Sequence, residues 1–250
     1  MKVAIVFIGT GKYINFLPMY YENIEKYFLP KYYESIEKYF LPNSEKTILA
    51  FTDGDLNETP DNVRVYHQEH LDWPYITLKR FGTINKARQA IEDHDYLVFL
   101  DADTRVVAPI TEEEFLSDKP YFGVHHPCHA LGMQPHTTYP GAFETNLDSR
   151  AGVTEDDDTS IYYQGCLWGG RVPQVLDMID ELDSRVEEDL SNDVIALWHD
   201  ESQLNKFYSE VKEDVHLLGP EYAYPEVFKD YCNFEPKIVH LAKDNSSYQV

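Results

Sequence analysis

The sequence predicts an α/β protein with a sheet flanked by helices, and three observations support this class. Apolar runs and helical patterns alternate through the first hundred residues, which is typical of a largely parallel sheet. An unbroken apolar run at residues 96–100 leads directly into Asp101 and Asp103, as expected of a buried strand that ends at a ligand site. The 250 residues, of which 43% are hydrophobic, are sufficient for one large domain or two small ones.

Composition argues against several classes of protein. The formal net charge of −23 makes a nucleic-acid backbone or an anionic membrane an unfavourable partner. We expect no membrane span, because no apolar run approaches the ~20 residues that a span requires. The three cysteines, Cys128, Cys166 and Cys232, are odd in number and form no Cys-x-x-Cys motif, which argues against a disulfide framework and against a zinc site. No small-residue cleavage site follows the apolar N-terminus, so we expect a first strand there and a cytoplasmic location.

The chain begins with a predicted strand at residues 3–8, which is followed by Gly9, Thr10 and Gly11. Glycine in the turn after a first strand lets the backbone approach a ligand closely. The full dinucleotide-binding fingerprint is absent, so a plain tight turn is an equally good explanation.

A 12-residue segment then occurs twice in tandem, at residues 20–31 and 32–43. The copies differ at only two pairs of positions: Asn23 and Ser35, and Lys31 and Asn43. Each copy has apolar residues at helical spacing and ends in Leu-Pro, which stops a helix. One such helix is enough for the first crossover between strands. We therefore expect the second copy either to extend the crossover or to sit loosely outside the core.

The remaining elements follow from the apolar periodicity. Glycines near the end of the strand at 161–170 indicate close approach of a ligand or another backbone. The expected elements are strands at 47–52, 62–67, 121–126 and 161–170, and helices at 78–92 and 171–190.

Asp101 and Asp103 form the first candidate site. In open α/β sheets ligands bind at the carboxyl ends of the strands, where these acids are expected. Two neighbouring carboxylates repel each other, and a cation would relieve the repulsion. Hard oxygen ligands suit Mg²⁺ or Mn²⁺, commonly shared with a substrate phosphate. The alternative is a turn with two solvated acids.

The second candidate site lies at residues 198–208. Asp200 followed by Gln203 resembles a capping box, so we expect a helix to begin at Asp200 with Glu201 in its first turn. Glu201 could act as a nucleophile, a base or a charge stabiliser, and Trp198 could stack on a sugar ring. The alternative is an ordinary helix start with acidic residues in its first turn.

These stretches resemble one known family. Residues 198–207, Trp-His-Asp-Glu-Ser-Gln-Leu-Asn-Lys-Phe, closely resemble the Trp-His-Asp-Glu-Ser-His-Leu-Asn-Lys-Tyr signature of family 6 glycosyltransferases, the relatives of the blood-group A/B transferases and α-1,3-galactosyltransferase. Residues 162–170 resemble the family's Tyr-Tyr-x-Gly-x-Phe-Phe-Gly-Gly, residues 126–127 its His-Pro, and residues 101–103 its Asp-Val-Asp. The resemblance covers nearly the whole chain, and its ten-residue motif is highly specific.

The resemblance implies a GT-A fold, with a Rossmann-like mixed sheet flanked by helices. It implies a single domain at residues 1–250, whose N-terminal half binds a UDP-sugar and whose C-terminal half binds the acceptor. The implied reaction is a retaining transfer of Gal or GalNAc, in an α-1,3 linkage, onto a β-galactoside-type oligosaccharide or glycolipid. Because both acids of the Asp-x-Asp are present, the resemblance implies dependence on Mn²⁺ (or Mg²⁺). The N-terminus without a stem resembles the bacterial or viral members of the family.

The resemblance also implies roles for single residues. Asp103 should bind the metal directly, Asp101 should contact the metal or the ribose, and Glu201 should be the nucleophile or stabilise an oxocarbenium ion. A side chain larger than glycine at Cys166 should crowd an N-acetyl group, which favours Gal over GalNAc. The implied donor-binding residues are Ile8, Gly9, Thr10, Tyr13, Arg88, Asp101, Gln164, Cys166, Asp200 and Lys243. The implied acceptor-binding residues are His126, Trp198 and His199.

Two other functions compete with this interpretation. Residues 98–104 match the first motif of haloacid-dehalogenase-type phosphatases, in which Asp101 would be the phosphorylated nucleophile and Asp103 an acid/base. That motif normally lies near the N-terminus, and the sequence has no downstream Gly-Asp-x-x-x-Asp. The second alternative is a non-catalytic sugar-binding module, which would retain UDP binding without turnover.

Overall fold

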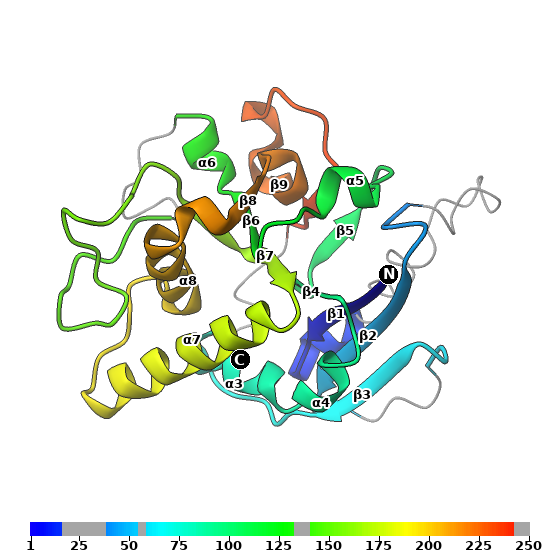
Figure 1. Ribbon diagram of the computed structural model, residues 1–250, viewed down its shortest axis with the longest axis horizontal. Coiled ribbons are helices and arrows are strands. Elements are labelled where there is room, and N and C mark those ends of the chain that lie inside the picture. Colours follow the sequence, from blue (N-terminus) through cyan, green and yellow to red (C-terminus); the bar gives the residue numbers. More distant parts are fainter. Residues whose placement is uncertain (17–38, 55–58, 133–140, 243–250) are drawn as a thin grey trace.

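A seven-stranded mixed sheet forms the centre of the computed structural model, which describes residues 1–16, 39–54, 59–132 and 141–242 (Figure 1). Its strand order is β3-β2-β1-β4-β7-β6-β8. The first four strands are parallel, β7 is antiparallel to β4 and β6, and β8 is parallel to β6. The strands are β1 (Lys2–Ile8), β2 (Glu45–Thr52), β3 (Val63–His67), β4 (Tyr96–Leu100), β6 (Tyr121–His125), β7 (Tyr163–Arg171) and β8 (Val215–Leu218). The strands predicted from the sequence are all confirmed, and β8 was not predicted.

A second, three-stranded sheet has the order β5-β10-β9. It consists of β5 (Thr104–Val106), β9 (Tyr224–Pro225) and β10 (Ile238–His240). These strands are too short to give a periodic pattern, so the sequence did not reveal them. Because β10 is antiparallel to β5, this sheet brings the C-terminal part of the chain beside the end of β4.

The longer helices lie on one face of the main sheet. Alternate strand residues point to opposite faces, so Val3 and Ile5 enter one core cluster while Ala4 and Val6 enter the other. The second cluster packs against the longer helices, and Figure 1 shows α3 and α7 on that side with α5 on the opposite side. The helices are α2 (Tyr75–Leu78), α3 (Arg80–Asn85), α4 (Arg88–Ile91), α5 (Glu112–Phe115), α6 (Pro127–Ala130), α7 (Gln174–Ser191) and α8 (His199–Glu210), and the 3-10 turns are η1 (Gly11–Phe16), η3 (Lys212–Asp214), η4 (Pro220–Ala223) and η5 (Glu226–Tyr231).

The helix predicted at residues 78–92 is wrong as a single element. Three short helices, α2, α3 and α4, replace it, with breaks at Lys79 (φ −91°, ψ 16°) and Ala87 (φ −101°, ψ 12°). Both breaks lie in the sparsely populated bridge region of backbone conformations. The segment is also rich in weak helix formers, namely Gly82, Thr83 and Asn85.

Most of the tandem duplication lies outside the described residues, which resume at Tyr39. The end of the second copy packs in the core. Phe40 and Leu41 are buried, the Phe40 ring meets Phe115 edge-on with centroids 5.2 Å apart, and the Leu41 amide donates to the Ile110 carbonyl at 2.8 Å. This end of the duplication is therefore integral to the fold.

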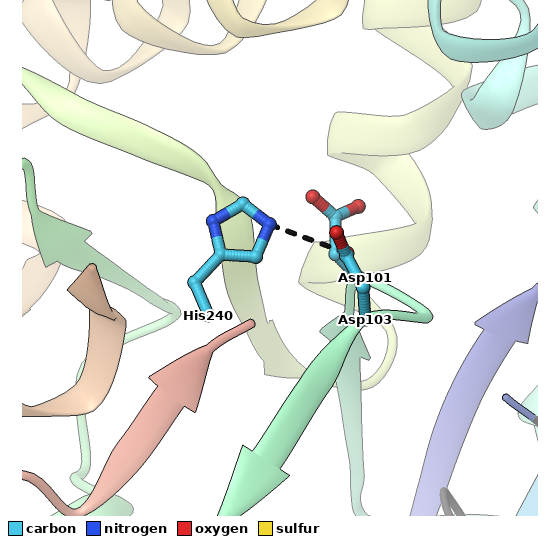
Figure 2. A group of neighbouring side chains, drawn as sticks. All are labelled: Asp101, Asp103 and His240. Carbon is cyan, nitrogen blue, oxygen red and sulfur yellow. Dashed lines mark hydrogen bonds and ion pairs between the residues drawn. The ribbon is translucent and has the colours of Figure 1, made fainter. Parts of the chain in front are cut away.

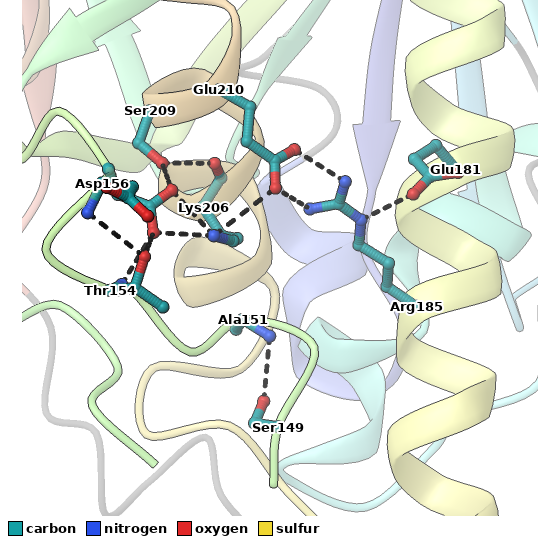
Figure 3. A network of polar contacts seen from close by, with 10 residues as sticks. Ser149, Ala151, Thr154, Asp156, Glu181, Arg185, Lys206, Ser209 and Glu210 are labelled. Carbon is teal, nitrogen blue, oxygen red and sulfur yellow. Dashed lines mark hydrogen bonds and ion pairs between the residues drawn. The ribbon is translucent and has the colours of Figure 1, made fainter. Parts of the chain in front are cut away.

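A polar network anchors α8 to α7 and to the loop before β7 (Figure 3). Arg185 of α7 donates to Glu181 and to Glu210, both at 2.7 Å. Lys206 of α8 donates to Asp157 at 2.7 Å. Asp157 of this loop thus helps to hold α8 in place.

Within the described part of the chain, no helix combines the length and apolar character needed to cross a membrane.

Candidate active site

Asp101 and Asp103 lie in a tight turn directly after β4, at the carboxyl edge of the parallel strands. The Asp101 amide donates to the Cys166 carbonyl at 2.9 Å, and the Thr104 hydroxyl donates to the Asp101 carbonyl at 2.7 Å. The Asp103 side chain is buried, whereas that of Asp101 is 25% exposed. The predicted position of both acids at this edge is confirmed.

His240 joins these two acids (Figure 2). Its Nε2 lies 3.2 Å from Oδ1 of Asp103, and one ligand atom from each of the three residues lies within 4.8 Å of the others. Two carboxylates and an imidazole form a donor set that suits Mn²⁺ or a related divalent cation. Sequence reasoning did not anticipate His240, because 137 residues separate it from Asp103.

Arg80, at the start of α3, connects the acids after β4 with those of α8. Its guanidinium lies 3.4 Å from Asp101 Oδ1 and 3.0 Å from Asp200 Oδ2, and it donates to the Gly165 carbonyl at 3.1 Å. The guanidinium also lies 4.5 Å above the centre of the Phe99 ring. Burial lowers the pKa of Arg80, but the charges of Asp200 and Asp101 outweigh burial and leave the pKa raised.

Arg88, which the resemblance assigns to the donor, does not lie beside Asp200, and Arg80 lies there instead. The Arg88 side chain is 37% exposed and pairs with Asp180 at 2.8 Å and with Glu92 at 3.3 Å, on the outer surface of α4. The sequence contained a signal for Arg80. Its spacing of four residues from Ile84 places it on a buried helical face, where a charged residue is rare unless it is paired.

Glu201 and Asp200 occupy the first turn of α8, where Asp200 is buried and Glu201 is half-buried. Glu201 accepts a hydrogen bond on each oxygen, at 2.7 Å from the Tyr162 hydroxyl and at 2.7 Å from the Gly165 amide. A Cβ atom at Gly165 would lie 3.2 Å from the Glu201 Cβ, so glycine permits this close approach. The predicted close approach of another backbone occurs farther along the strand, at Gly169, where an added Cβ atom would lie 2.1 Å from the Leu97 carbonyl oxygen.

The pKa values of both acids are raised to about 7. Burial is the largest cause for each, because it disfavours the charged form. Arg80 opposes the shift at Asp200, and the Gly165 amide and the Tyr162 hydroxyl oppose it at Glu201. Acids tuned to near-neutral pKa in a polar cluster are typical of an active site.

The capping-box start predicted at Asp200 is wrong, because α8 begins at His199. Trp198 is the N-cap, and its amide donates to the Ser202 hydroxyl at 2.9 Å. Gln203 does not close a capping box, because its side chain donates to the buried Asp189 at 2.8 Å. Glu201 nevertheless lies in the first turn, as predicted.

The turn after β1 holds the predicted nucleotide-binding residues at the same edge of the sheet. The Gly9 amide donates to the Phe51 carbonyl at 2.9 Å, and Thr10 is buried with its hydroxyl 3.0 Å from Nδ1 of His70. A Cβ atom at Gly9 would lie 2.4 Å from the Phe7 ring, so only glycine fits there. Ile8 ends β1, and Tyr13 packs against the core. Lys243 lies outside the described residues.

Three residues expected to contact the sugars carry buried polar atoms without a hydrogen-bond partner: Nε2 of His126, Oε1 of Gln164 and Nε1 of Trp198. His126 Nδ1 accepts from the Cys128 amide at 3.2 Å, so Nε2 carries the proton. Burial, with a smaller contribution from His129, lowers the pKa of His126 to about 3 and keeps the ring neutral. Buried polar atoms rarely lack a partner in a folded protein, so these three are suited to meet a ligand.

His199 begins α8 with a left-handed backbone conformation (φ 51°), and its ring meets Trp73 edge-on with centroids 4.9 Å apart. Left-handed conformation costs energy for a non-glycine residue, and such strain is concentrated at functional sites. Cys166 is buried on β7, and burial raises the pKa of its thiol.

A mixed α/β sheet with paired carboxylates at its carboxyl edge and two acids on a facing helix is consistent with a glycosyltransferase of GT-A type. The model of the family described as glycosyltransferase family 6 matches residues 1–249. The chain therefore belongs to glycosyltransferase family 6 and is a hexosyltransferase. This membership sets aside the phosphatase and the non-catalytic alternatives.

Individual relatives agree with the family. The Escherichia coli O-antigen biosynthesis glycosyltransferase WbnI is 30% identical over 250 residues, which covers 99% of this chain and 97% of that protein. The mouse globoside alpha-1,3-N-acetylgalactosaminyltransferase 1 is 32% identical over 161 residues, which covers 64% of this chain and 44% of that protein. The rat histo-blood group ABO system transferase 2 is 26% identical over 250 residues, which covers 96% of this chain and 68% of that protein.

Proposed function

We propose that the protein is a retaining, Mn²⁺-dependent transferase that moves Gal or GalNAc from a UDP-sugar, in an α-1,3 linkage, onto a β-galactoside-type oligosaccharide or glycolipid. The observation that carries the proposal is the chain of contacts from Asp101 through Arg80 to Asp200 and Gly165, and from Gly165 to Glu201. These contacts join a candidate metal site to the half-buried carboxylate of Glu201. The name of the mouse relative supports an α-1,3 linkage and a GalNAc donor.

The donor set at Asp101 and Asp103 suits a divalent cation, and such a cation, when bound, neutralises charge on a departing diphosphate. The net charge of −23 makes this help necessary for an anionic donor. In the proposal the turn after β1 receives the uridine, and Lys243 reaches the diphosphate. The domain as a whole places the donor in its N-terminal half and the acceptor in its C-terminal half.

Glu201 is proposed to face the anomeric carbon. Above its pKa of about 7 the carboxylate is charged and stabilises, or attacks, an oxocarbenium-like centre. Tyr162 and Gly165 fix both of its oxygens and thereby orient it before the substrate binds. Arg80 holds Asp200 beside it, where Asp200 is proposed to bind the hydroxyls of the donor sugar.

His126, Trp198 and His199 are proposed to bind the acceptor, and Gln164 and Cys166 to select the donor sugar. The buried, unpartnered atoms of His126, Gln164 and Trp198 support these roles. The Cys166 side chain leaves less room than glycine would, which favours Gal over GalNAc.

The first test is UDP release from a panel of UDP-sugars, with and without Mn²⁺ and with no acceptor. Slow, metal-dependent hydrolysis of UDP-Gal or UDP-GalNAc is expected, and EDTA should abolish it. Full activity in EDTA would remove the metal from the proposal, and no release from any UDP-sugar would refute the proposed donor class.

The second test is Glu201→Gln, which keeps the shape of the side chain but removes its charge. Turnover should fall by about 10²–10⁴-fold while UDP binding, measured by calorimetry, is retained. Glu213→Gln, at an exposed position just after α8, is the matched control and should keep the native rate. A native rate for Glu201→Gln would exclude Glu201 from the chemistry.

A further inference from the structure

The backbone, rather than a flexible side chain, brings His240 to the two acids after β4. In the antiparallel pair of β10 and β5, His240 lies directly opposite Thr104, the residue after Asp103. The Leu241 amide also donates to the Asp103 carbonyl at 2.9 Å. These ladder contacts fix the register of the pair, and a slip of one residue would turn the imidazole to the other face of the strand.

The three side chains converge from two segments, the turn after β4 and the end of β10 (Figure 2). His240 Nε2 points at Asp103 Oδ1, 3.2 Å away, and the candidate ligand atoms of all three residues lie within 4.8 Å of one another. Protein ligands lie about 2.0–2.3 Å from a transition metal, so atoms on opposite sides of one ion are about 4–4.6 Å apart. The observed spacing therefore suits a shared ion after small side-chain adjustments.

The donor set differs in chemistry from a pair of carboxylates. Mg²⁺ prefers oxygen ligands, keeps several waters, and is usually held by one or two carboxylates together with substrate phosphates. An imidazole nitrogen favours transition metals over Mg²⁺. A third ligand from the protein also reduces the dependence of metal binding on the phosphates of the donor.

We propose that His240 is a direct ligand of the cation held by Asp101 and Asp103. This ligand lets the chain bind Mn²⁺ before the nucleotide and in preference to Mg²⁺. The inference rests on the proposed metal dependence of transfer and deepens it by assigning the residue that selects the metal. It also gives β10 a function, since this strand carries the third ligand.

Pulsed EPR of bound Mn²⁺ tests the proposal directly, using the full chain without nucleotide and with Mn²⁺ below stoichiometric amounts. A ligating imidazole produces ¹⁴N modulation of the Mn²⁺ electron spin echo, which carboxylates and water do not. We expect ¹⁴N modulation in the native protein and none in His240→Gln. The Mn²⁺ affinity of the variant should fall at least about tenfold, and its preference for Mn²⁺ over Mg²⁺ should fall with it.

His67→Gln is the matched control. His67 is exposed at the end of β3, three strands or ~14 Å from β4 in the sheet. This variant should keep both the ¹⁴N modulation and the native Mn²⁺ affinity.

The native spectrum decides the question even if His240→Gln fails to fold. Bound Mn²⁺ without ¹⁴N modulation would overturn the proposal and leave His240 as a hydrogen-bond partner of Asp103, and so would Mn²⁺ that binds only when UDP is added. UDP-sugar turnover measured in parallel separates the two ideas. Turnover with Mn²⁺ but without ¹⁴N modulation refutes only the ligand, whereas modulation without any turnover refutes only the proposed function.

Discussion

Glu201 illustrates how single residues tune this site. Burial disfavours its charged form, while the Tyr162 hydroxyl and the Gly165 amide stabilise that form through hydrogen bonds. The balance leaves its pKa at about 7, raised from the usual value of a glutamate. A small change in one partner should therefore change the fraction of ionised carboxylate at neutral pH.

Tyr162→Phe should shift the pH profile of the reaction. The variant removes a hydrogen bond that lowers the pKa of Glu201, so burial is opposed less and the pKa rises further. If the ionised carboxylate is the active form, the acid limb of the kcat/KM profile moves to higher pH, by about one unit for a lost hydrogen bond of ~1.4 kcal/mol.

Tyr163→Phe is the control for this variant, since the neighbouring Tyr163 ring packs against Tyr208 rather than against Glu201. It should leave the acid limb unchanged. An unshifted limb in Tyr162→Phe would show that Tyr162 does not tune Glu201.

The site residues that the sequence predicted differ from those that it missed in how the fold brings them to the site. Asp200 and Glu201 were predictable because a contiguous motif places them in one helical turn. Arg80 and His240 belong to no such motif, and tertiary contacts bring them to the acids. Arg88 was assigned to the donor by its matched position in the family resemblance, which gave no role to Arg80.

At the scale of elements, β7 connects the two halves of the sheet. It pairs antiparallel with β4 on one side and with β6 on the other. Gly169 lies opposite both Val98 and Phe122, where the backbones and rings leave no space for a side chain. The sequence predicted this strand and its glycines, but it could not reveal the strand's direction, because antiparallel pairing depends on contacts between distant segments.

Gly169→Ala should destabilise the fold. A Cβ atom there would lie 2.1 Å from the Leu97 carbonyl oxygen and 2.4 Å from the Phe122 ring, so the strand has to shift. We expect a loss of about 1–3 kcal/mol in the free energy of unfolding, measured by urea denaturation.

Gly82→Ala is the matched control for Gly169→Ala. A Cβ atom at Gly82 would meet only the flexible end of the Asp183 side chain, and alanine favours helix α3. This control should stay within about 1 kcal/mol of the native stability. Equal stability of the two variants would contradict the close packing described around β7.

The tandem duplication leads to a prediction that one of its two copies can be deleted. Deleting residues 20–31 keeps the second copy, whose Phe40 and Leu41 are buried and whose Asn43 contacts Glu112. We expect a folded protein with native rates of UDP release.

Deleting residues 32–43 instead is the matched comparison, because it leaves an almost identical sequence with Lys31 in the place of Asn43. The Asn43 side-chain contact with Glu112 is then lost, which should lower stability by about 1 kcal/mol in thermal unfolding. An insoluble product from the first deletion would show that both copies are structural.

At the scale of the whole molecule, the net charge of −23 opposes the approach of an anionic donor. Arg80 lies within the site, but it already forms ion pairs with Asp101 and Asp200. Exposed charges are screened over about 8–10 Å at physiological salt, so repulsion by the whole surface depends on ionic strength.

Binding of UDP without metal should therefore tighten as KCl is raised from about 10 to 150 mM, by about two- to threefold in Kd. Binding of uncharged uridine, measured by the same calorimetry, should not respond and serves as the control. In saturating Mn²⁺ the UDP effect should shrink, because the cation cancels much of the ligand's charge. Weaker UDP binding at higher salt would mean that local cations, not the global charge, dominate.

The position of β4 in the middle of the sheet has a consequence for synthesis of the chain. The first hundred residues complete four parallel strands in the order β3-β2-β1-β4, and β4 then presents an open, apolar edge until β7 is made about 70 residues later. Ribosomes add about 5–20 residues per second, so this edge waits for ~4–14 s. During that interval neighbouring nascent chains can pair through it. Slower initiation, which spaces the nascent chains apart, should raise the yield of folded enzyme more than a change to the finished active site would.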